Sequence, residues 1–106
     1  MKIDVGAHEK EVVDKAVKTL LRYWRVTDDE AASLLGKESD LPERQKQLLA
    51  IHRALRLLYP HNPELLYGWI RMRNSYLDDK RPLDLMLSGG QGFDDVIKYL
   101  NHSLFK

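Results

Sequence analysis

The apolar positions near the start of the chain recur at steps of three and four residues. From about Ala7 to Trp24, this spacing places valines, alanines and leucines on one side and lysines and acids on the other. Such a period is typical of an amphipathic helix that buries one stripe. We therefore predict a first helix over residues 7–24 whose apolar stripe packs in the core. The stripe consists of Val12, Val13, Ala16, Val17, Leu20, Leu21 and Trp24.

Start and stop signals place two more helices in the first half of the chain. Thr27, with Glu30 three residues later, has the form of a capping box, which predicts a short helix. Gly36 is expected to end it, because glycine adopts the left-handed conformation of a helix end at little cost. Pro42, near a first helical position, and Pro60 bound a longer third helix with a leucine-rich stripe.

Helix start signals and turns also divide the second half of the chain. Asn62-Pro63 and Pro82 each predict the start of a short helix, and residues 73–75 predict a turn between them. The glycine-rich stretch Ser88–Gly92 is expected to form a turn before a last helix. Strand-like alternation is not sustained, so we predict an all-α fold, a compact bundle of five or six helices. The last helix has Phe93, Val96, Ile97 and Leu100 as its apolar face, with Asp94 and Asp95 expected in its first turn.

Composition narrows the classes of protein that such a fold can serve. The 106 residues carry 17 basic and 16 acidic side chains, spread evenly, without the basic stripe that phosphate-dominated DNA binding usually requires. Cysteine is absent, which excludes disulfides, thiolate nucleophiles and cysteine-type zinc sites. No apolar run approaches the roughly 20 residues of a membrane-spanning helix, and Met1–Asp4 is too polar for a signal peptide. We expect a cytoplasmic protein with one small core and no membrane contact.

The residues that could carry chemistry have sufficient structural explanations. Ser88–Gly92 is rich in glycine, as a phosphate cradle is, but its spacing is not G-x-G-x-x-G and its preceding segment reads as a helix. No serine lies in a G-x-S-x-G motif, and the histidines have no spacing typical of metal ligands. We therefore predict no catalytic residue, no metal site and no cofactor. The histidines are His8, His52, His61 and His102.

The segment Thr27–Gly36 has a second interpretation. Ala32, four residues before Gly36 in a short capped helix, fits the first helix and turn of a helix-turn-helix. A recognition helix should follow the turn directly. Here residues 37–42 follow, and then a long helix whose apolar stripe is committed to the core. Either the turn leads into that long helix, or the recognition helix is missing.

Four segments of the second half together resemble a known family. Trp69–Asn74, Arg81–Leu87, Gly89-Gly90 and Val96–Leu100, in this order, are similar to the toxin-binding domain of Xre/MbcA/ParS-type antitoxins. Thr27–Gly36 resembles the Xre-like helix-turn-helix of that family, here in degenerate form. The likeness covers about residues 17–101. It implies two parts with one continuous core: helix-turn-helix-like helices over residues 1–40 and a toxin-binding domain over residues 41–106.

The resemblance implies an antitoxin of a type II toxin–antitoxin system. The usual partner in this family is a RES-domain toxin that degrades NAD⁺, and the antitoxin covers the entrance to its active site. The chemistry then belongs to the toxin, and this chain is not an enzyme. Family members also dimerise and repress their own operon. A DNA-binding regulator of the Xre type is therefore the alternative function, and a helical adaptor with another partner is a third.

The resemblance and the residue patterns together assign expected roles. In the DNA-binding alternative, Lys37, Arg44 and Lys46 would face phosphates. Structural roles are expected for Trp69, Pro82, Leu83 and Leu85, with Trp69 as a core anchor. Asn74 could either cap the segment that follows it or touch a partner. Contacts with the partner are expected from Asn74, Arg81, Ser88, Gly89, Gly90, Gln91, Tyr99, His102, Phe105 and Lys106.

Overall fold

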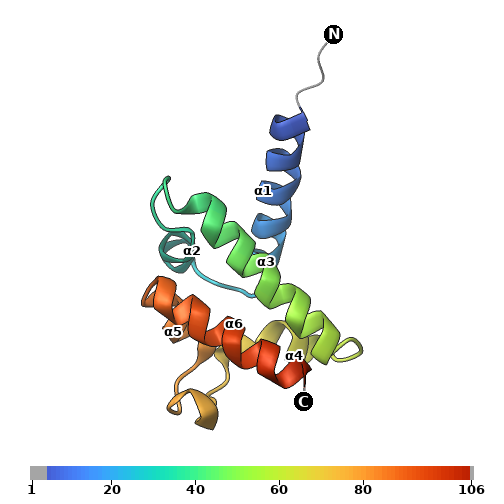
Figure 1. The fold of residues 1–106 in the computed structure, drawn as a ribbon, viewed down its shortest axis with the longest axis vertical. Helices are drawn as coiled ribbons and strands as arrows, with labels where there is room; N and C mark the ends of the chain where they lie inside the picture. Colours follow the sequence, from blue (N-terminus) through green and yellow to red (C-terminus); the bar gives the residue numbers. More distant parts are fainter. Residues whose placement is uncertain (1–4, 106) are drawn as a thin grey trace.

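Helices make up almost all of the regular structure in the computed structural model, which describes residues 5–105 and the side chains from His8 onward (Figure 1). Lys106, an expected partner contact, lies outside the described residues. No β-strand is present in residues 5–105, where a single isolated bridge joins Asn74 and Lys80. The prediction of an all-α fold with five or six helices is confirmed. The helices are α1 Val5–Tyr23, α2 Asp28–Leu35, α3 Leu41–Leu58, α4 Pro63–Gly68, α5 Pro82–Leu87 and α6 Gly90–Leu104, with 3₁₀ turns η1 Trp69–Arg71 and η2 Ser75–Leu77.

The predicted helix ends are held by the expected local hydrogen bonds. The Thr27 hydroxyl accepts from the Glu30 amide at 3.1 Å, and the Glu30 carboxylate accepts from the Thr27 amide at 2.8 Å. This reciprocal pair satisfies two backbone donors that have no partner within α2. Gly36 follows α2 with φ at +69°. Asn62 caps α4 by accepting from the Leu65 amide at 3.2 Å.

The core lies between α3, α5 and α6, and α1 and α2 add to it from one side (Figure 1). α3 and α6 run side by side in the same direction (Figure 1). Burial of the apolar side chains of these helices is the main source of stability in a domain of this size. The fully buried side chains come from α1, α2, α3, η1, α5, α6 and the turn after α1: they are Val17, Trp24, Leu34, Leu48, Ile51, Leu55, Ile70, Leu83, Met86, Phe93, Val96 and Leu100.

The expectation for the first apolar stripe is correct for only half of its length. Val17, Leu20 and Leu21 are buried, but Val12 is 55% exposed and Ala16 is exposed. In Figure 1 the start of α1 projects beyond the bundle, and Val12 and Ala16 line an open hollow between α1 and α3. Helical periodicity identifies the apolar side of a helix, but not how far the neighbouring helices extend.

The turn after α1 is tied to the second half of the chain by one arginine. Arg71 in η1 donates from Nε to the Trp24 carbonyl at 3.1 Å and from Nη2 to the Arg25 carbonyl. Arg25 adopts a left-handed φ of +57°, so its carbonyl needs a partner outside a helix. Of the two alternatives for the turn after α2, the structure shows the first: residues 36–40 lead directly into α3.

Two expectations for the glycine-rich stretch are wrong. α6 begins at Gly90, so the turn consists of Ser88 and Gly89 only, and Gly90–Gly92 belong to the helix. Asp94 and Asp95 consequently lie beyond the first turn of α6. The physical reason is close packing: a Cβ atom on Gly92 would lie 1.6 Å from the Leu85 carbonyl oxygen. Gly92 is thus the point at which the backbone of α5 rests on α6.

We predict that Gly92→Ala destabilises the protein by about 3 kcal/mol, because the α5 backbone must move away. Chemical denaturation followed by circular dichroism measures this change. Gly90→Ala is the matched control in the same helix. Its added Cβ would find its nearest neighbour, Nη1 of Arg44, at 3.7 Å, an ordinary contact, so its stability should match wild type or exceed it slightly. Equal stability of the two variants would contradict the prediction.

Candidate functional site

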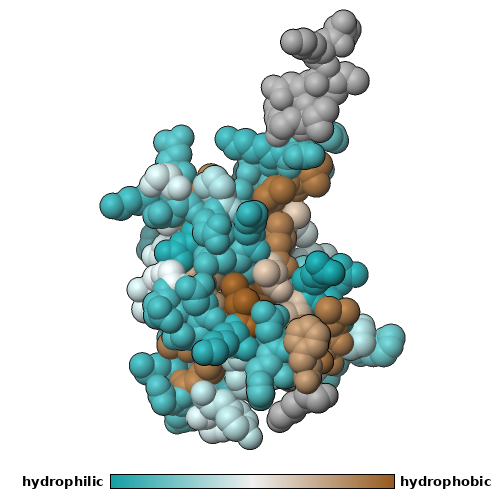
Figure 2. Space-filling model, viewed as in Figure 1, coloured by the Kyte–Doolittle hydropathy of each residue, from teal (hydrophilic) through white to brown (hydrophobic). Residues whose placement is uncertain are grey.

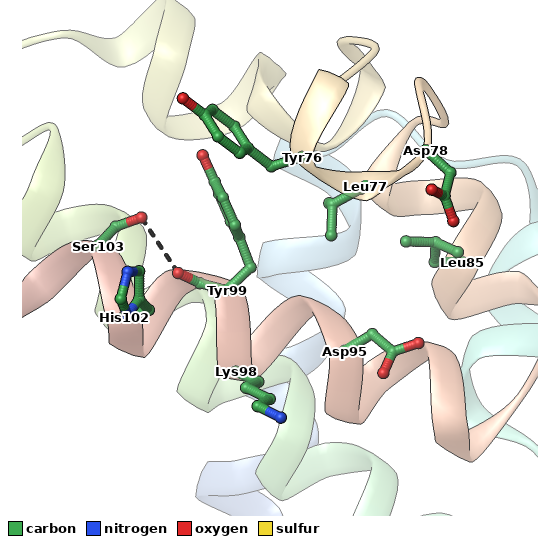
Figure 3. Close-up of a pocket in the computed structure, with 9 residues that line it drawn as sticks. All are labelled: Tyr76, Leu77, Asp78, Leu85, Asp95, Lys98, Tyr99, His102 and Ser103. Atoms are coloured by element: carbon green, nitrogen blue, oxygen red, sulfur yellow. Dashed lines mark hydrogen bonds between the residues drawn. The ribbon is translucent and has the colours of Figure 1, made fainter.

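An open hollow of about 590 Å³ lies between the outer side of α6 and the turn η2 (Figure 3). We call it the notch. η2 and the following Asp78 line one side, α6 lines the other, and Leu85 of α5 lies near Leu77 and Asp78 (Figure 3). The lining residues are Tyr76, Leu77, Asp78, Leu85, Asp95, Lys98, Tyr99, His102 and Ser103. Because it brings together two segments about 20 residues apart, its shape depends on how η2 is held.

Asn74 fixes the conformation of η2. Its side-chain oxygen accepts from the Tyr76 amide at 2.9 Å, and its backbone carbonyl accepts from the amides of Leu77 and Asp79 at 2.9 and 3.0 Å. Its own amide donates to the Lys80 carbonyl at 3.1 Å, which closes the loop. Asp78 and Asp79 both have left-handed φ angles, which aspartate tolerates better than most residues. Of the two roles expected for Asn74, the structure shows the capping role.

A row of three aromatic rings connects the notch to the core. Buried Trp69 stacks on Tyr99 at a centroid distance of 6.0 Å, and Tyr99 stacks on Tyr76 at the same distance. Figure 3 shows the two tyrosine rings side by side, one from α6 and one from η2. Tyr76, at the outer end, is 79% exposed. The row therefore holds a large aromatic side chain in a defined position at the surface.

The charges of the notch are mixed and separated. The carboxylates of Asp78 and Asp95 lie toward one end, while the hydroxyl ends of Tyr76 and Tyr99 lie toward the other (Figure 3). Asp95 accepts a hydrogen bond from the Gln91 side chain at 2.9 Å. Lys98 and His102 supply basic groups along α6. Such a surface can orient a polar partner as well as pack against an apolar one.

The structure brings together only some of the expected partner contacts. Tyr99 and His102 line the notch, and Gln91 reaches its edge through Asp95. Ser88 instead donates to the Leu85 carbonyl at 2.6 Å and, with Gly89 and Gly90, forms the junction of α5 and α6. Phe105 is 87% exposed but follows α6 and is not part of the notch.

Arg81, another expected contact, is engaged within the chain. It donates two hydrogen bonds to the Asp84 carboxylate, from Nε at 2.9 Å and from Nη2 at 2.6 Å. These bonds lower the pKa of Asp84 and raise the pKa of Arg81. The pair lies at the exposed start of α5, where the negative charge of Asp84 in the first turn is favourable toward the helix dipole.

The residues expected to have structural roles are mostly buried. Trp69 is 7% exposed, Leu83 is fully buried and Pro82 is buried at the start of α5. Leu85 is half-buried and forms part of the notch.

Among the residues expected to face DNA, Lys37 and Lys46 are exposed. Arg44 packs over the Phe93 ring, with its guanidinium carbon 4.7 Å from the ring centroid.

Sequence reasoning missed the residues that shape the notch most. Tyr76 and Asp78 come from a turn that carries no helical periodicity, and Asp95 had been assigned to a helix terminus. One available signal was the pair of acids after Asn74-Ser75, which favours a tight left-handed turn. The approach of that turn to Tyr99 is a tertiary contact, and residue spacing does not reveal it.

No group of three histidine or acidic side chains within residues 8–105 lies close enough to hold a metal ion. None of the helices described here is both long and apolar enough to cross a membrane.

Comparison with known proteins gives one match. Residues 54–103 match the family model of the antitoxin Xre/MbcA/ParS C-terminal toxin-binding domain. The matched segment begins within α3 and ends in the last turn of α6, so it contains every residue that lines the notch. No curated protein and no solved structure matches the chain.

We predict that Asn74→Ala loosens η2, since the Tyr76 amide loses its side-chain acceptor. The expected cost is about 1 kcal/mol, together with faster hydrogen exchange at the amides of Tyr76, Leu77 and Asp79. Hydrogen exchange followed by NMR measures both effects. Asn62→Ala removes the equivalent cap of α4 and serves as the control, with unchanged exchange in η2. Unchanged exchange in the Asn74 variant would contradict the assigned role.

Proposed function

We propose that this chain, whose residues 54–103 match the C-terminal toxin-binding domain of the Xre/MbcA/ParS antitoxins, neutralises a cognate toxin through the face that bears the notch. The observation that carries this proposal is the position of the notch: all of its lining residues fall within the matched segment. The chain acts as a binding protein, and any catalytic chemistry in the pair belongs to the toxin.

Tyr76 is suited to be the main anchor of this interface. It is 79% exposed, yet its ring is already stacked on Tyr99, and the cap from Asn74 holds its backbone. A side chain that is ordered before binding loses little conformational entropy when it binds. Tyrosine is also among the residues that dominate the energy of protein interfaces.

The toxin that we propose is a RES-domain enzyme that degrades NAD⁺, as the resemblance of the C-terminal half implies. In that arrangement the antitoxin covers the entrance to the toxin's active site, so inhibition is steric and this chain needs no cofactor. The complex would assemble in the cytoplasm, where the toxin meets NAD⁺. A homodimer of this chain within the complex, as in other members of the family, is part of the same proposal.

We predict that Tyr76→Ala weakens inhibition of the RES-domain toxin about 30-fold, the loss that corresponds to one interface hot spot. The melting temperature should not change, because the ring is exposed. NAD⁺ consumption by the purified toxin, titrated with the antitoxin, gives the inhibition constant.

Tyr23→Ala is the matched control for this test. Tyr23 is also an exposed tyrosine, 57% accessible, and it stacks on another tyrosine, Tyr67, at 4.8 Å, but it belongs to α1 and lies outside the notch. Its removal should leave inhibition intact. If the toxin retains full activity with wild-type antitoxin in excess, the proposed function is wrong. If both tyrosine variants inhibit equally well, the proposed interface is wrong.

DNA binding is a second candidate function, favoured by one observation. The turn between α2 and α3 presents the exposed Lys37, and Lys46 is exposed in α3, the helix that follows this turn. Binding of this kind should fall steeply with salt, because each phosphate contact releases counterions. A gel-shift titration of operator DNA at two salt concentrations tests it. Lys37→Glu combined with Lys46→Glu should abolish the shift, and a shift that is unaffected by salt would contradict this function.

A further inference from the structure

A second surface lies where α3 meets the C-terminal end of α6. We call it the α3/α6 groove; its principal lining residues are Lys46, Leu49, Arg53, Leu57, Leu104 and Phe105. Leu57 is 61% exposed and Phe105 is 87% exposed. Figure 2 shows hydrophobic side chains gathered at this end of the α3–α6 pair, beside hydrophilic ones. Large apolar side chains grouped at a surface, with a polar rim, are typical of an interaction site.

The charged side chains that line the groove are both basic. Lys46 and Arg53 are exposed on the outer face of α3, with Arg56 exposed close by. Among residues 8–105, no carboxylate lines the groove. The ion pairs found among residues 8–105 are Arg73–Asp79 and Arg81–Asp84, so neither cation of the groove is neutralised there. An occupant that completes this surface must bring apolar groups for its floor and negative charge for its rim.

The groove is also separate from the notch. On α6, Asp95, Tyr99 and His102 line the notch, whereas Asn101 and Leu104 line the groove. At 100° per residue these two sets fall on opposite sides of the helix. A toxin seated in the notch would therefore leave the groove open to a different molecule.

We propose that the α3/α6 groove binds an amphipathic helix of a partner protein, one with a leucine-type apolar stripe flanked by aspartate or glutamate. Two helices running side by side leave a furrow into which the side-chain ridge of a third helix packs. Leu57 and Phe105 bury against that stripe, and Lys46 and Arg53 pair with the acidic flank. This site is independent of the proposed inhibition of the toxin.

Two synthetic peptides test the proposal directly. Both are fluorescently labelled helical peptides with leucines at positions i, i+3, i+4 and i+7; one carries glutamates beside this stripe, and its twin carries lysines. Fluorescence anisotropy with the full chain measures binding of each. The glutamate peptide should bind at least about tenfold more tightly than the lysine peptide, and added salt should reduce this difference.

Surface variants locate the peptide on the protein. Arg53→Glu and Leu57→Asp should each weaken binding of the glutamate peptide at least about tenfold, through lost charge attraction and lost apolar burial respectively. Both residues are exposed, so circular dichroism should show unchanged folding. Lys98→Glu, which makes the same kind of charge change in the notch, is the matched control and should leave binding unchanged.

Several results would overturn the proposal. Equal binding of the two peptides, or no binding of either, would contradict the proposed charge complementarity between the groove and an acidic helix. Loss of binding in Lys98→Glu but not in Arg53→Glu would place the peptide in the notch. Self-association of wild-type chain in ultracentrifugation that Leu57→Asp abolishes would assign the groove to a second copy. Displacement of the peptide by duplex DNA of random sequence would reduce the surface to a general anion site. No toxin is used, so the outcome does not depend on the proposed inhibition.

Discussion

The close approach of α5 to α6 at Gly92 is the constraint on which the second half of the molecule depends. Only a residue without a Cβ allows the Leu85 carbonyl to lie against α6 at this point. Leu85 itself lines the notch. Tyr99, which lines the α6 side of the notch, lies two turns after Gly92 on the same helix. The crossing therefore sets both the depth of the notch and the distance across which η2 reaches α6. Of the glycines in this stretch, Gly92 is the one that the packing of α5 against α6 requires.

The aromatic row from Trp69 through Tyr99 to Tyr76 connects the packed core to the surface by ring stacking. Its inner end belongs to the core, and its outer end is among the most exposed side chains of the described chain. Asn74 holds the backbone of the outer end with four hydrogen bonds, two of them to its own carbonyl. A flexible turn would offer the same tyrosine at a higher entropic cost. The packing of the core and the fixed position of the exposed Tyr76 ring thus depend on the same contacts.

Local features of the chain were predictable from the sequence, and contacts between distant segments were not. The capping box at Thr27 and Glu30, the cap at Asn62, the start of α5 at Pro82 and the end of α2 at Gly36 each depend on a few adjacent residues. The start of α6 was misplaced because Gly90 and Gly92 have low helix propensity, and the packing that favours glycine at 92 comes from another helix. Phe105 was correctly expected at the surface, but only the fold shows that it faces away from the notch.

The two bonds from Arg71 to the carbonyls of Trp24 and Arg25 bear on how far the matched segment can be separated from the rest of the chain. They join η1, inside the matched segment, to the end of α1, well before it. Trp24, Leu34 and Leu48 also precede that segment, and all three are fully buried in the same core. Residues 54–103 are therefore not a portable module in this protein. Any evolutionary exchange of residues 54–103 between related chains must carry along, or rebuild, the N-terminal helices that close their core.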